Sequence, residues 1–211
     1  MNNPISQLKR YAPVYAVLYL ALGFFAFAFF GLAGEYGISV AYFTRDPAIT
    51  LYGHPFVGAL SHIGIIFWCA ALGICFFTAA VLRKAKLERL PMFFFVSGLF
   101  TTWLMLDDLF MFHEYVFPES LGIPQDGILI SYVVLMALYL VAYGRLLLNM
   151  EYSILLLACG FFAVSMITDI AMEQSDIQFL IEDGAKLFGI VTWLMFFARE
   201  GYLKISKPLR N

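Results

Sequence analysis

Six apolar runs, each close to the length needed to cross a lipid bilayer, constrain this chain more than any other feature. A hydrocarbon core about 30 Å thick is crossed by roughly 20 helical residues. Only 13% of the residues are charged, about half the ~25% of soluble domains. The sequence therefore predicts an all-α polytopic membrane protein, a single transmembrane domain over residues 1–211, with six spans. We place these spans at about Ala12–Ala33, Phe56–Leu82, Pro91–His113, Gly127–Leu148, Tyr152–Met172 and Ile181–Ala198.

The positive charges predict which side of the membrane each loop faces. Eleven of the 13 Lys and Arg residues lie at one set of span ends, and only Arg45 and Lys186 lie at the other. Lys and Arg are enriched in cytoplasmic loops. We therefore expect both termini to be cytoplasmic.

Acidic residues are distributed in the opposite way. Twelve of the 15 Asp and Glu residues lie at the side predicted to be extracytoplasmic. Acidic residues contribute little to membrane orientation, and ionisable groups at membrane depth usually mark functional sites. The concentration of acids at this side therefore predicts a functional site facing the extracytoplasmic side.

The candidate site is centred on the sequence Asp-Asp-Leu-Phe-Met-Phe-His-Glu at the end of the third span. Helices that alternate in direction bring the ends of spans one, three and five to the starts of spans two, four and six. Polar residues from several spans should therefore meet in one layer. The candidate catalytic residues are Asp107, Asp108, Glu114, Asp169, Glu182, Asp183 and Lys186.

Helical spacing suggests which of these side chains share a face. Asp107 and Glu114 are seven residues apart and would share one face if the third helix continued that far. Glu182 and Lys186 are four apart and also share a face. Trp68 is expected to be a packing or interfacial residue.

The residue types favour a divalent metal ion. Histidine suits Zn and Fe, and carboxylates are further oxygen ligands. The candidate metal ligands are His62, Asp107, Asp108, His113 and Glu114. The three cysteines are dispersed through apolar runs, which excludes a CxxC-type thiolate site.

The leading hypothesis is a metal-dependent, hydrolase-like membrane enzyme that acts on a lipid or small apolar substrate. A zinc or iron ion would activate water, one acid would be the general base, and Lys186 an electrostatic partner. Two alternatives stay open: a non-catalytic small subunit of a larger membrane complex, and a proton or cation transporter. Expected partners are membrane lipids and other membrane proteins, and no nucleic acid.

Overall fold

The computed structural model describes residues 4–45, 47–84 and 89–206, and most of these residues are helical and none lies in a strand. The all-α prediction is confirmed. Six long helices are joined by turns and short helical segments. Their bounds are α1 Pro4–Tyr36, α2 Ala41–Thr44, α3 Pro47–Thr50, α4 Ala59–Lys84, α5 Arg89–Phe110, the π-helix η1 Phe112–Val116, α6 Phe117–Leu121, α7 Gln125–Leu147, α8 Tyr152–Ala171 and α9 Asp176–Ser206.

Each predicted span falls largely within one long helix, and five of these helices (α1, α4, α5, α7 and α8) are long and apolar enough to cross a membrane. Helix α9 is also long, but its apolar stretch is interrupted by Glu182, Asp183 and Lys186 near its start. The sixth crossing therefore stays a prediction.

The chain divides into two compact units, Met1–Val57 and Gly58–Asn211. The first unit contains α1 and the short helices α2 and α3, within a connection that is rich in turn-forming residues. The side chains of α1 are mostly apolar, including Phe24 and Phe27. Such a composition is typical of a helix that crosses a membrane.

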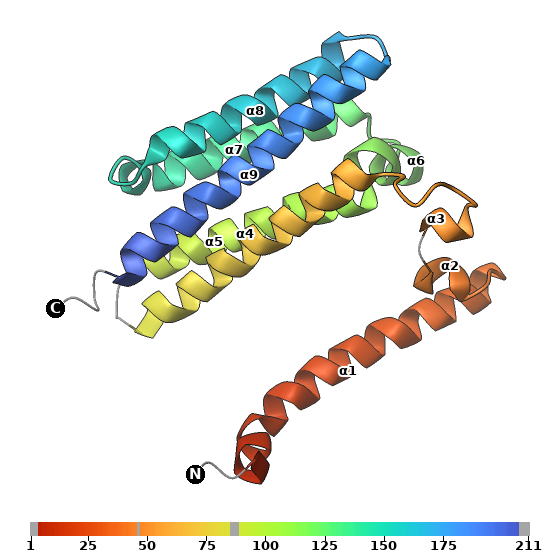
Figure 1. Ribbon diagram of the computed structural model, residues 1–211, viewed down its shortest axis with the longest axis horizontal. Helices are drawn as coiled ribbons and strands as arrows, with labels where there is room; N and C mark the ends of the chain where they lie inside the picture. Colours follow the sequence, from red (N-terminus) through yellow and green to blue (C-terminus); the bar gives the residue numbers. More distant parts are fainter. Residues whose placement is uncertain (1–3, 46, 85–88, 207–211) are drawn as a thin grey trace. The chain divides into compact units, whose positions relative to one another are not determined.

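The second unit is a bundle in which α4 packs against α5 and α9, and α9 packs against α8 (Figure 1). Its core is aromatic: Trp193 is fully buried and its ring contacts Phe197 and Phe162. A Cβ at Gly189 would lie 2.7 Å from the ring of Phe162. Only glycine at position 189 therefore lets α9 approach α8 this closely.

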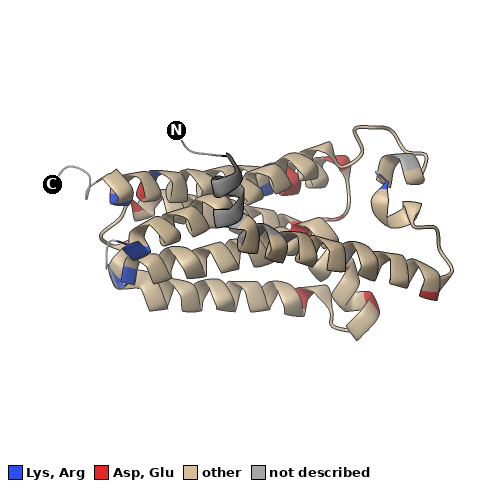
Figure 2. Ribbon diagram, turned by 90° about the horizontal axis from the view of Figure 1, so that it is seen from below, with Lys and Arg blue, Asp and Glu red and all other residues tan. Residues whose placement is uncertain are grey.

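Most basic residues of the second unit lie at one end and most acids at the other (Figure 2), with Glu200 beside Lys204 at the basic end and Lys186 beside Asp108 at the acidic end. Arg83, Lys84 and Arg145 lie where α4 and α7 end. The acids of the candidate site lie at the opposite end. The bundle therefore brings the acids of several helices to one end, as the alternation of helices predicts.

The end of α5 corrects one prediction. The α-helix stops at Phe110 because Met111 adopts a left-handed conformation with φ 52°, and the π-helix η1 follows. The third helix therefore does not continue to His113 as an α-helix. The prediction that Asp107 and Glu114 share a helix face is wrong, since the turn at Met111 redirects the chain between them.

Candidate functional site

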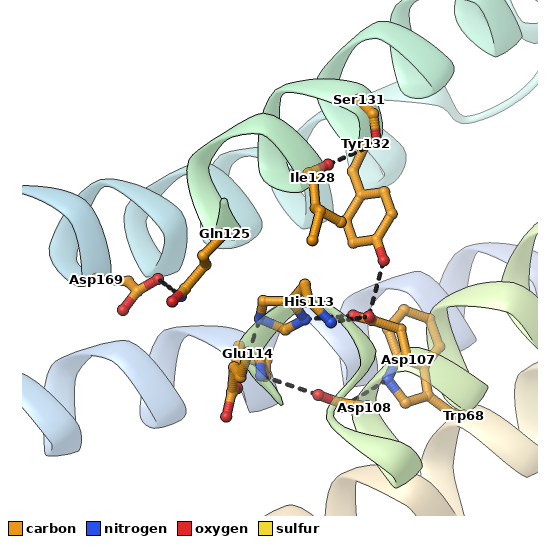
Figure 3. Close-up of polar contacts among 11 residues, drawn as sticks. Trp68, Asp107, Asp108, His113, Glu114, Gln125, Ile128, Ser131, Tyr132 and Asp169 are labelled. Atoms are coloured by element: carbon orange, nitrogen blue, oxygen red, sulfur yellow. Dashed lines mark hydrogen bonds and ion pairs between the residues drawn. The ribbon is translucent and has the colours of Figure 1, made fainter. Parts of the chain in front are cut away.

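Asp107 is the buried centre of the polar layer, the name used here for Asp107, Asp108, His113, Asp169, Glu182 and Lys186 with their hydrogen-bond partners. It lies in the last turns of α5 and is 5% exposed. His113 follows the Met111 turn and folds back on it: the backbone N–H of His113 donates to Oδ1 over 3.0 Å, and its Nδ1 lies 2.6 Å from Oδ2. The hydroxyl of Tyr132 on α7 donates to Oδ1 over 2.7 Å (Figure 3). Three donors thus satisfy one carboxylate.

Asp108, the next residue, faces a different set of partners. The Lys186 ammonium from α9 donates to its Oδ1 over 2.9 Å, and the Trp68 indole from α4 donates to its Oδ2 over 3.1 Å. The Asp108 side chain is 9% exposed and that of Lys186 is 27% exposed. This ion pair joins α5 to α9, and the indole adds α4.

Asp169 and Glu182 complete the polar layer from α8 and α9. Each accepts a hydrogen bond from a neutral amide: Gln125 donates to Asp169 over 2.8 Å, and Gln178 donates to Glu182. Both carboxylates are partly buried. Neither forms an ion pair with a residue that the structure describes.

The remaining candidates lie outside this arrangement. His62 is exposed in the first turns of α4, and Asp183 is exposed on α9. Glu114 is exposed, but its Oε1 lies 3.5 Å from Nε2 of His113. Over the described ranges, no three His, Cys, Asp or Glu side chains are grouped closely enough to hold one metal ion.

A cavity of about 510 Å³ lies against this layer, and we call it the site cavity. Its charged and imidazole side chains are Asp107, Asp108, His113, Asp169, Glu182 and Lys186, and Tyr132 and Ser165 add hydroxyl groups. The rest is mainly apolar, including Phe100, Leu104, Leu129, Met136 and Phe162. A cavity of this size and lining, with a few convergent polar groups, has the general form of a small-molecule site.

The pKa of His113 reflects two opposing influences. Burial lowers the pKa of the imidazole, but the hydrogen bond and negative charge of Asp107 raise it by more, so the pKa lies above its ordinary value of 6.5. Asp107 also holds Nδ1 and so fixes the ring. A histidine held by a carboxylate in this way is oriented for proton transfer, or for metal binding, through its other nitrogen.

Four partners of the acids were not predicted as site residues. They are Tyr132, Gln125, Gln178 and Trp68, the last having been assigned to packing. A buried carboxylate needs hydrogen-bond donors, but the sequence does not indicate which donor lies near which acid. Gln125 and Gln178 lie two and three residues before the predicted fourth and sixth spans, and this position alone does not assign them to an acid.

The fold and the site together indicate the class of protein to which this chain belongs. An all-helical chain with five helices able to cross a membrane, and a polar layer facing a largely apolar cavity, has the character of a multi-pass membrane protein.

The chain belongs to the family described as "Domain of unknown function (DUF8692)", whose model matches residues 14–199. The match includes every residue of the polar layer. No curated protein and no solved structure matches the chain.

Proposed function

We propose that this protein is a membrane-embedded enzyme that holds a lipid or small apolar molecule in the site cavity and acts on its polar end. The observation that carries this proposal is the meeting of His113, held by Asp107, with a largely apolar cavity of about 510 Å³. The predicted orientation supports a site that opens on the extracytoplasmic side, with cytoplasmic termini.

The reaction that suits this arrangement is hydrolysis. His113 takes a proton from water through Nε2, while the water oxygen attacks the carbonyl carbon of an ester or amide. The bond to the leaving group then breaks, and the imidazolium gives the proton to that group. Asp107 stabilises the imidazolium during the reaction, as the carboxylate does in a catalytic triad.

A metal-dependent form of the reaction, with zinc or iron as the predicted ion, is an alternative within this proposal. In that form Nε2 of His113 would bind the ion together with Oε1 of Glu114, 3.5 Å away, and the ion would activate the water in place of the imidazole. Asp107 and Asp108 already have protein donors. Water and substrate oxygens would complete the coordination, as is usual in catalytic sites with open positions.

The test is hydrolysis by the purified protein in lipid vesicles that contain a panel of ester and amide lipids. We expect release of a fatty acid or alcohol by the wild type and its loss in His113→Gln. The matched control is His54→Gln, because His54 lies in the first unit and its Nδ1 only accepts from the backbone N–H of Phe56. Hydrolysis that persists unchanged in His113→Gln would refute the proposal, and loss of activity on chelation would support the metal-dependent form.

A non-catalytic role in a larger membrane complex is the second candidate. The observation that favours it is the complete pairing of Asp107 and Asp108, since such pairs can serve only to join helices. That role predicts normal folding, no hydrolysis of any panel lipid, and co-purification with other membrane proteins.

A further inference from the structure

We infer that the site cavity takes an amphiphile with one hydrocarbon chain and a cationic, amine-type head group, which arrives from the lipid between α7 and α8. This inference rests on the proposed function, because it names the class of molecule that the same cavity would hold. It depends on three observations: the exposed lining, the cavity size and the balance of charge at its polar end.

The lining residues show where the cavity opens. Ile130 and Val133 of α7, with Ile167 and Ile170 of α8, line the cavity and yet are 55–63% exposed on the outer surface. A side chain that both lines a cavity and reaches the surface lies at an opening. All four are apolar, and α7 and α8 are helices able to cross a membrane. The opening therefore faces hydrocarbon, which suits a molecule that arrives from the bilayer.

The size of the cavity favours a single chain. A cavity of about 510 Å³ lies within the roughly 300–1,000 Å³ of small-molecule pockets. One long alkyl chain with a small head group is of this size. The second chain of a diacyl lipid would have to remain outside.

The charges at the polar end favour a cation. Four carboxylates line the cavity, against one lysine and one histidine. Asp108 is paired with Lys186 and Asp107 with His113. Among the residues that the structure describes, the hydrogen-bond partners of Asp169 and Glu182 are the amides of Gln125 and Gln178. A partly buried carboxylate without a cation is costly, so an ammonium head group placed near Asp169 and Glu182 would relieve that cost.

The same arrangement disfavours an anionic head group. A phosphate or carboxylate in this cavity would meet Asp169 and Glu182, neither of which forms an ion pair within the described ranges, and like charges brought together cost binding free energy. Lys186 offers little compensation because its ammonium is already bound to Asp108. The cavity therefore discriminates by repulsion of anions as well as by attraction of cations.

Trp68 provides a reporter for this test, since it lines the cavity whereas Trp103 and Trp193 do not. Bromine quenches indole fluorescence on contact. The purified full chain in a nonionic detergent is titrated with mid-chain dibrominated stearylamine and, separately, with dibrominated stearic acid at neutral pH. The part of the quenching that disappears in Trp68→Phe reports occupancy of the cavity.

We expect the amine to reach half-maximal quenching at a concentration at least tenfold lower than the acid. In the double variant Asp169→Asn with Glu182→Gln, this preference should fall to threefold or less. Val133→Phe, at the opening, should slow binding of the amine several-fold. Val134→Phe should not, because Val134 is exposed on α7 but does not line the cavity.

The outcomes separate this inference from the proposed function. Quenching of Trp68 by the acid at equal or lower concentration would overturn the inference and leave a lipid-binding cavity. Quenching by neither molecule would overturn both. If the double variant does not fold, the comparison of amine and acid on the wild type still decides.

Discussion

His113 Nδ1 lies 2.6 Å from Asp107 Oδ2, although the two residues are six apart and no regular α-helix would bring them together. The left-handed conformation of Met111 reverses the chain between them. The backbone N–H of His113 donates to the same carboxylate. This local turn therefore fixes the position of the imidazole and holds its Nδ1 against Asp107, which determines the tautomer.

Replacing Tyr132 by phenylalanine should remove one of the three donors to Asp107 without changing the size of the side chain. Hydrogen bonds between membrane helices contribute about 1 kcal/mol, so the free energy of unfolding in detergent should fall by about that amount. The matched control is Tyr115→Phe, an exposed tyrosine in η1, which should change it little. Equal losses in the two variants would contradict the contact between Tyr132 and Asp107.

Met111→Gly should stabilise the protein. A left-handed conformation costs a non-glycine residue about 1–2 kcal/mol, and the Met111 side chain is 51% exposed, so little packing is lost. After the entropy cost of glycine, a net gain of about 0.5–1 kcal/mol is expected in chemical or thermal unfolding. Leu109→Gly, two residues earlier in α5, should destabilise by about 1 kcal/mol. Destabilisation by both would show that Met111 is not left-handed.

Gly189→Ala should destabilise the bundle by about 1–3 kcal/mol because overpacking forces neighbours to shift. The new methyl group would lie 2.7 Å from the Phe162 ring, which stacks on Trp68. Gly184→Ala on the same helix has nothing within 4 Å and should be neutral or stabilising by up to about 1 kcal/mol. Thermal unfolding of the two variants, compared with the wild type, measures the difference.

The ion pair between Glu151 and Arg199 should make stability depend on pH. The hydrogen bond from Arg199 lowers the pKa of Glu151 below its ordinary value of 4.5. A lowered pKa in the folded state gives stability that is present above the unfolded value and is lost as pH falls through the folded value. The difference in melting temperature between the wild type and Glu151→Gln should therefore be full above about pH 4.5 and be lost as the pH falls further, through the lowered pKa of Glu151. A difference that grows in acid would contradict the pair.

Membrane orientation can be tested with single cysteines in a background that lacks Cys69, Cys75 and Cys159. A cysteine at position 119 should react with a membrane-impermeant maleimide added outside intact cells. A cysteine at position 84 should react only after the membrane is opened. Both sites are exposed in the structure, so the reverse pattern would overturn the predicted orientation.

The sequence by itself determined the helices and their approximate ends. Hydrophobic length is a local property, so six runs of about 20 apolar residues are visible without any knowledge of packing. It also determined that acids from α5, α8 and α9 gather at one end of the bundle, because consecutive helices alternate in direction. For α9, hydrophobic length alone does not establish a membrane span, because Glu182, Asp183 and Lys186 interrupt its apolar stretch.

Only the tertiary structure decided which polar groups meet. Asp108 and Lys186 are 78 residues apart and Asp107 and Tyr132 are 25 apart, and such contacts depend on how the helices rotate and pack. The turn at Met111 also lay beyond sequence reasoning, because a methionine gives no signal for a left-handed backbone. The lengths of the apolar runs therefore placed the acids at one end of the bundle. The packing of the helices and the turn at Met111 decided which residue each acid contacts.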